Sequence, residues 1–126
     1  MAAASTTFHE NQDDLEPETK DRHRAIVSLM EELEAVDWYD QRIDAAQDQE
    51  LKAILAHHRD EEKEHAAMLL EWLRRRDPSL DRQLRAYLFI ENGVLEREAE
   101  DDPAEAKAPS SADGSLGIGS LREVRP

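Results

Sequence analysis

Residues 59–70 have the sequence RDEEKEHAAMLL, and most of their charges fall where a helix would face water. Glu62 and His65 instead lie within an apolar stripe of helical spacing that runs from Leu51 to Leu73. An unpaired carboxylate on the buried side of a helix costs several kcal/mol of stability. A divalent metal ion bound by both side chains would compensate this cost. The stretch therefore predicts both a packed helix and a metal site.

The composition fits one small helical domain. The chain has 126 residues, no cysteine and a formal net charge of -14. Such an acidic chain lacks the basic face that a nucleic-acid backbone or an anionic membrane needs, so we expect neither partner. The N-terminus has no signal-peptide pattern, and the longest apolar run, residues 66–70, is too short to cross a bilayer. We therefore expect a cytoplasmic protein without disulfides or thiolate metal sites.

Two long helices are predicted on either side of a short break at residues 46–47. Apolar residues recur at helical spacing from about residue 15 to residue 46, with no glycine and no proline after Pro17. After the break, Asp48 suits the N-cap of a second helix, and the three arginines at 74–76 suit its C-terminal end. Because the break is so short, the two helices should be antiparallel neighbours.

The rest of the chain predicts a third helix and polar termini. Asp77 and Pro78 suit the N-cap and first position of a shorter helix that ends before Gly93. We divide the chain into a disordered arm at 1–12, a helical hairpin domain at 13–92, an acidic disordered linker at 93–112 and a C-terminal peptide at 113–126. One hairpin is too small to close a core on both faces. We therefore expect an all-α protein whose hairpins dimerise into a four-helix bundle.

The first helix supplies a further candidate ligand. In a hairpin centred on the break, residue n lies opposite roughly residue 94 - n, so Glu32 faces Glu62. One chain then offers Glu32, Glu62 and His65 to one position. A symmetric dimer would combine four glutamates and two histidines, enough for two metal ions. Carboxylates with one imidazole per metal favour iron or manganese.

Two other interpretations remain open at this point. Glu62 could pair with an arginine or lysine while His65 is a hydrogen-bonded core histidine, in which case the protein is a non-catalytic helical scaffold. Alternatively, the metal is present and the protein acts on peroxide or only binds manganese. His57 and His58 flank the same stripe, and for them we expect a supporting or interface role instead of ligation.

Three runs of the sequence resemble the encapsulated ferritins: residues 22–28, 30–39 and 59–68. The resemblance covers about residues 18–90. It implies a two-helix protomer, a ferroxidase centre with two iron ions between the two chains of a dimer, and a ring of such dimers, typically a decamer. It also implies oxidation of Fe(II) with dioxygen and delivery of the iron for storage inside an encapsulin nanocompartment.

The same resemblance implies roles for individual residues. Those that match the family's functional positions are Glu32, Glu62 and His65 as iron ligands, Tyr39 close to the metal centre, and Glu31 and Glu34, with Trp38 adjacent, as a metal-entrance site where calcium can also bind. From the residues alone, the entrance positions would be a solvated charged face with a tryptophan at a subunit contact. Only the resemblance favours metal binding there.

The C-terminal residues 114–122, GSLGIGSLR, resemble the cargo-loading peptides that dock inside encapsulin shells. Leu116, Ile118 and Leu121 are side chains suited to apolar pockets, and the glycines let the backbone approach a wall closely. The alternative is a disordered end without a partner. We therefore expect residues 113–126 to bind an encapsulin shell protein.

Overall fold

The computed structural model describes residues 7–107, with side chains described up to residue 100. Its elements are the 3-10 helix η2 (Gln12–Asp14) and the α-helices α1 (Pro17–Ala45), α2 (Gln49–Arg76), α3 (Pro78–Tyr87) and α4 (Val94–Lys107). No strand occurs in these residues, so the all-α prediction is confirmed. The described helices include none that is long and apolar enough to cross a membrane. The chain divides into two compact units, Met1–Arg76 and Asp77–Pro126.

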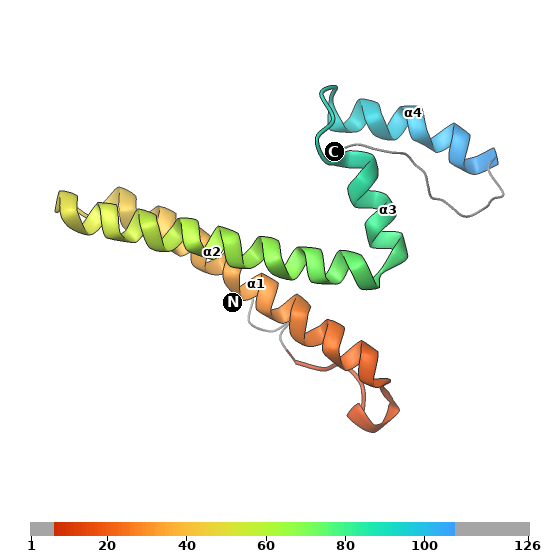
Figure 1. Ribbon diagram of the computed structural model, residues 1–126, viewed down its shortest axis with the longest axis horizontal. Coiled ribbons are helices and arrows are strands. Elements are labelled where there is room, and N and C mark those ends of the chain that lie inside the picture. The colour runs from red at the N-terminus through yellow and green to blue at the C-terminus, as the bar shows by residue number, and fades with distance from the viewer. Residues whose placement is uncertain (1–6, 108–126) are drawn as a thin grey trace. The chain divides into compact units, whose positions relative to one another are not determined.

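The first unit is the predicted hairpin, in which α1 and α2 run antiparallel and lie side by side (Figure 1). Pro17 occupies the start of α1, where its missing N–H costs no helical hydrogen bond. The two helices are separated by Ala46, Gln47 and Asp48. The Asp48 carboxylate accepts a hydrogen bond from the backbone N–H of Leu51 at 2.8 Å, as expected of the N-cap. The predicted hairpin and its boundaries are thus confirmed to within two residues.

The hairpin has a very small core. The buried residues in the described part of the chain are Ala25, Ala66 and Leu73. Large apolar side chains stay about half exposed, among them Leu33 at 54%, Ile54 at 46% and Met68 at 58%. Two helices cover only one side of each other, so one chain cannot bury the whole apolar stripe. The expectation that Glu62 and His65 are buried is therefore wrong for a single chain, in whose described residues no polar side chain is buried.

The N-terminal arm is more ordered than predicted. The ring of Phe8 stacks on that of His23 with 4.1 Å between the ring centroids. The Asn11 side chain accepts a hydrogen bond from the backbone N–H of Asp13 at 3.0 Å and so caps η2. These local contacts fix the chain ahead of α1, so the disordered arm is wrong for residues 7–12. Residues 1–6 of the predicted arm lie outside the described residues.

In the second unit, α3 begins as predicted. The Asp77 carboxylate accepts a hydrogen bond from the backbone N–H of Leu80 at 3.1 Å, and Pro78 follows the cap directly. The helix ends shortly before Phe89, which has a φ of 64°. This left-handed conformation is uncommon for a bulky side chain and turns the backbone out of the helix.

The predicted linker is wrong for residues 94–107, which form α4. The Glu96 side chain accepts a hydrogen bond from the backbone N–H of Gly93 at 3.0 Å, which satisfies one free donor at the helix start. The Arg97 Nε donates to the Ala86 carbonyl at 2.9 Å and connects α4 to α3. Alanine, glutamate, arginine and lysine also have high helix propensity, which the acidic composition concealed. Residues 108–112 and the predicted shell-binding peptide lie outside the described residues.

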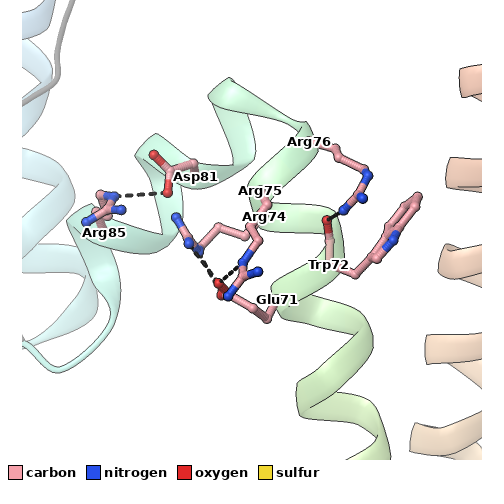
Figure 2. A network of polar contacts seen from close by, with 7 residues as sticks. All are labelled: Glu71, Trp72, Arg74, Arg75, Arg76, Asp81 and Arg85. Carbon is pink, nitrogen blue, oxygen red and sulfur yellow. Dashed lines mark hydrogen bonds and ion pairs between the residues drawn. The ribbon is translucent and has the colours of Figure 1, made fainter.

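A group of charged side chains closes the C-terminal end of α2 (Figure 2). Glu71 accepts hydrogen bonds from Arg74 Nε at 2.8 Å and from Arg75 Nε at 2.7 Å. These two guanidinium groups, Arg74 first, lower the pKa of Glu71 to about 2. The guanidinium of Arg76 lies 4.0 Å from the ring centroid of Trp72. The arginines thus bind local carboxylate and aromatic partners at the helix end, where cations also suit the helix dipole.

The Glu71 carboxyl is expected to titrate far below a free glutamate, whose pKa is near 4.5. Arg74→Gln should raise this pKa toward 4.5, because it removes the larger of the two stabilising hydrogen bonds to the carboxylate. Side-chain carbonyl NMR shifts followed against pH measure the midpoint. Arg24→Gln, which removes an arginine from α1, is the matched control and should leave the midpoint unchanged.

Candidate metal centre

Three side chains predicted as ligands come together within the hairpin. Glu32 projects from α1, and Glu62 and His65 project from α2. Each contributes one ligating atom, and these atoms lie within 4.8 Å of one another. Within residues 7–100, this is the one group of three or more His, Asp and Glu side chains with such spacing. The antiparallel register that pairs Glu32 with Glu62 is responsible for the cluster.

The three side chains already contact one another. His65 Nδ1 lies 3.2 Å from Glu62 Oε1 and 3.6 Å from Glu32 Oε1. Glu62 and His65 meet because residues three apart share one face of a helix. The side chains of Glu32 and Glu62 are each 25% exposed, and that of His65 is 49% exposed. The centre therefore presents hard carboxylate oxygens and one imidazole nitrogen, a donor set that suits iron or manganese, on a surface still open to solvent.

Contacts among the three side chains shift their pKa values. The hydrogen bond to Glu62, followed by burial, raises the pKa of Glu32. The same hydrogen bond, with that of His65, lowers the pKa of Glu62. The hydrogen bond to Glu62 also raises the pKa of His65. The raised pKa values of Glu32 and His65 follow from the nearby Glu62 carboxylate, because a proton on either side chain lessens the repulsion between two carboxylates that lie close together.

Tyr39 contacts His58 and does not belong to the three-residue group. Its ring meets that of His58 edge-on, with 5.8 Å between the centroids. His58 is one turn from Glu62 on α2, and its charge helps to lower the pKa of Glu62. His57 instead forms an ion pair with Glu61, with 3.2 Å between Nε2 and Oε2. His58 therefore has a supporting position between Tyr39 and the carboxylates.

The predicted metal-entrance residues lie on the outer surface of α1. Glu31 and Trp38 are exposed and Glu34 is partly exposed. The guanidinium of Arg42 lies 5.8 Å from the Trp38 ring centroid. Neither glutamate belongs to a group of three ligating side chains in the part of the chain that the structure describes. The entrance site stays a prediction.

Sequence reasoning missed a polar contact next to the centre. Arg59 Nη1 on α2 lies 3.0 Å from Asp40 Oδ1 on α1. The hairpin register places Asp40 opposite roughly residue 94 - 40 = 54, more than one helical turn from Arg59. Only the reach of the long arginine side chain connects the two. No pattern in a single sequence indicates such a pair.

Comparisons with known proteins agree with this hairpin and its cluster. The family model described as EncFtn-like matches residues 7–91, more than half of the chain. The chain belongs to the EncFtn-like family. Membership confirms the resemblance to encapsulated ferritins that three runs of the sequence predicted. It covers α1, α2 and α3, and so includes the cluster of Glu32, Glu62 and His65.

Relatives extend the similarity over most of the chain. An encapsulated ferritin-like protein of Rhodospirillum rubrum is 58% identical over 129 residues, which cover 97% of this chain and 92% of the relative. A ferritin-like protein of Thermotoga maritima is 46% identical over 90% of this chain and 96% of its own length. The encapsulin nanocompartment cargo protein EncC of Myxococcus xanthus is 36% identical over 76% of this chain and 80% of its own length.

A solved structure supports the fold of the EncFtn-like chain. The crystal structure of a Nitrosomonas europaea protein has 62% sequence identity and a TM-score of 0.68. The match covers 69% of this chain and 96% of that one. The backbone of this chain is therefore similar to that of a relative whose structure was determined experimentally.

Metal binding to the centre should release protons and weaken at low pH. The ligand atoms must be deprotonated to bind a cation, and the raised pKa values of Glu32 and His65 keep them protonated to higher pH than usual. Affinity for Fe(II) under anaerobic conditions should fall as the pH is lowered through the pKa of His65, which lies above the ordinary 6.5. Calorimetry in two buffers of different ionisation enthalpy measures the protons released. Equal heats in both buffers near neutral pH would contradict the release of protons on metal binding.

Proposed function

We propose that this EncFtn-like protein is a ferroxidase that oxidises Fe(II) to Fe(III) with dioxygen. The observation that supports the proposal is the convergence of Glu32, Glu62 and His65, whose ligating atoms lie within 4.8 Å of one another. Their donor set suits iron, which enters the reaction as substrate. Membership in a ferritin-like family adds independent support.

The active unit in this proposal is a dimer. One chain offers two carboxylates and one imidazole, too few to hold two metal ions with positions left for dioxygen. A symmetric second copy doubles the set to the pattern of di-iron carboxylate bundles, with a glutamate from each of two helices and Glu-x-x-His from each of the other two. It would also cover apolar side chains that the hairpin leaves exposed, such as Leu33 and Ile54. Such dimers would assemble further into a ring, a decamer by the resemblance.

The three side chains would have different roles in binding iron. Glu62, in the middle of the α2 stripe, would bridge two Fe(II) ions across the dimer, with Glu32 and His65 as terminal ligands. Holding the ions together lets them supply two electrons to one dioxygen molecule. Carboxylate oxygens are hard ligands and stabilise Fe(III) over Fe(II), which favours the oxidation. A proton on Glu32 or His65 would leave when iron binds, and the ring of Tyr39 contacts that of His58, one turn from Glu62.

The product would be stored by a shell protein. Two relatives have names that describe an encapsulated protein and an encapsulin nanocompartment cargo protein. We extend this association to the present chain, with residues 113–126 as the segment that binds the encapsulin shell. The protein would then work inside a cytoplasmic nanocompartment, where Fe(III) accumulates. Glu31 and Glu34, beside Trp38, would guide incoming iron or hold Ca²⁺ on the way to the centre.

Removing either α2 ligand should slow iron oxidation. Glu62→Ala and His65→Ala are each expected to lower the initial rate of Fe(III) formation, measured by absorbance, by roughly tenfold or more. Glu50→Ala removes an exposed carboxylate in the first turn of α2 and is the matched control. Native mass measurement must show the same assembly in all variants. Wild-type rates in both ligand variants would refute the ferroxidase, and faster turnover with peroxide than with dioxygen would favour a peroxide-consuming enzyme.

Deleting the C-terminal peptide should abolish loading into a shell. Co-expression with an encapsulin shell protein and purification of the shell measure how much chain is retained. Removal of residues 113–126 is expected to reduce retention to background, and replacing Leu116, Ile118 and Leu121 by serine should have the same effect. Val124→Ser, a single apolar change near the end, is the milder comparison. Equal loading of the full and shortened chains would show that another part of the protein binds the shell.

A further inference from the structure

An ion pair joins the two helices on the turn side of the metal centre. Arg59 Nη1 on α2 lies 3.0 Å from Asp40 Oδ1 on α1, and its Nε lies 3.2 Å from Asp60 Oδ1 on its own helix. The Arg59 side chain is only 25% exposed, so its stem lies against the hairpin while its guanidinium reaches a carboxylate on each helix. Arg59 is one helical turn from Glu62, a metal ligand.

No residue at the turn end of the hairpin is fully buried. Ala25, Ala66 and Leu73 all lie toward the open end, away from the turn. From residue 26 to residue 65, a stretch that contains the turn, no residue is buried. The metal centre is therefore bounded by the small apolar core on one side and by the Arg59–Asp40 ion pair on the other.

The centre itself tends to separate the helices. The ligating atoms of Glu32 on α1 and Glu62 on α2 lie within 4.8 Å of each other, and the two carboxylates repel when both are ionised. Any slippage of α1 along α2 would take Glu32 away from Glu62 and His65, since successive turns of a helix are about 5.4 Å apart. An attraction between opposite charges at Arg59 and Asp40 opposes both movements.

We propose that Arg59 and Asp40 are positioning residues, whose ion pair holds Glu32 of α1 against Glu62 and His65 of α2 before a metal ion arrives. The inference rests on the proposed function only in that these three side chains bind a metal. Outer residues that orient ligands commonly affect metal affinity although they do not touch the ion.

Replacing Arg59 tests the positioning role well, because the loss of its charge and the loss of positioning change metal affinity in opposite directions. Removing a cation near a cation-binding centre would by itself raise metal affinity. Loss of positioning lowers it. We therefore expect Arg59→Gln in the full-length protein to weaken Co²⁺ binding, followed by its visible absorption, by about threefold, the range of a partly exposed ion pair. Asp40→Asn and the double variant should show the same loss as Arg59→Gln, because either change removes the whole interaction.

Further variants separate positioning from a general effect on folding. Glu32→Gln should abolish the sensitivity of Co²⁺ affinity to Arg59→Gln, since Glu32 is the ligand that the pair positions. Arg59→Lys keeps the charge and the stem and should recover affinity to within about twofold of wild type. Arg24→Gln removes an exposed arginine whose partner, Asp21 at 2.7 Å, lies on the same helix, and affinity should not change.

The outcomes distinguish this inference from the proposed function. Unchanged or increased affinity in Arg59→Gln, or the same loss when Glu32 is already replaced, overturns the positioning role while the ferroxidase stands. If wild-type protein binds no Co²⁺, the metal centre itself fails. If Arg59→Gln lowers helix content, Asp40→Asn takes its place in the test. The loss of Co²⁺ affinity caused by Asp40→Asn is then measured in the wild-type protein and in Glu32→Gln, and equal losses in the two would overturn the inference.

Discussion

The close approach of Glu32 and Glu62, two carboxylates that face each other from different helices, is the constraint on which the candidate metal centre depends. Few side chains around them are fully buried, because the buried residues in the described hairpin are Ala25, Ala66 and Leu73. The contact with Glu62 raises the pKa of both Glu32 and His65, so protons compete with a cation for these side chains. In the proposed ferroxidase, metal ions would take the place of such protons and would relieve the repulsion between the carboxylates.

The small hydrophobic core also links metal binding to dimerisation in the proposed function. The stripe that carries Glu62 and His65 leaves large apolar side chains half exposed, and the ligands themselves are partly open to solvent. A second copy would supply apolar contacts and ligands in one step, since both lie on one face of the hairpin. In the proposed ferroxidase, the dimer would therefore be part of the mechanism as well as a source of stability.

Local signals in the sequence were reliable where one residue type decides the backbone. Asp48 and Asp77 placed two helix starts correctly, the first helix begins within two residues of the predicted position, and the predicted break at residues 46–47 led to the antiparallel register that pairs Glu32 with Glu62. The amino-acid composition of residues 94–107 led to the wrong prediction of a linker, because an acidic stretch that contains proline is typical of linkers. At the start of α4 the Glu96 side chain accepts a hydrogen bond from the Gly93 N–H, and Arg97 donates to the Ala86 carbonyl of α3. Amino-acid composition does not indicate either contact.

The sequence by itself determined the all-α class, the hairpin and the identity of the three clustered side chains, because helical periodicity and a short turn place residues without further information. Only the tertiary structure decided how exposed the centre is in one chain, since exposure depends on what covers a helix face. It alone also revealed the Arg59–Asp40 ion pair, whose partners do not face each other in the register. A long flexible side chain joins them, and its direction is set by packing instead of spacing.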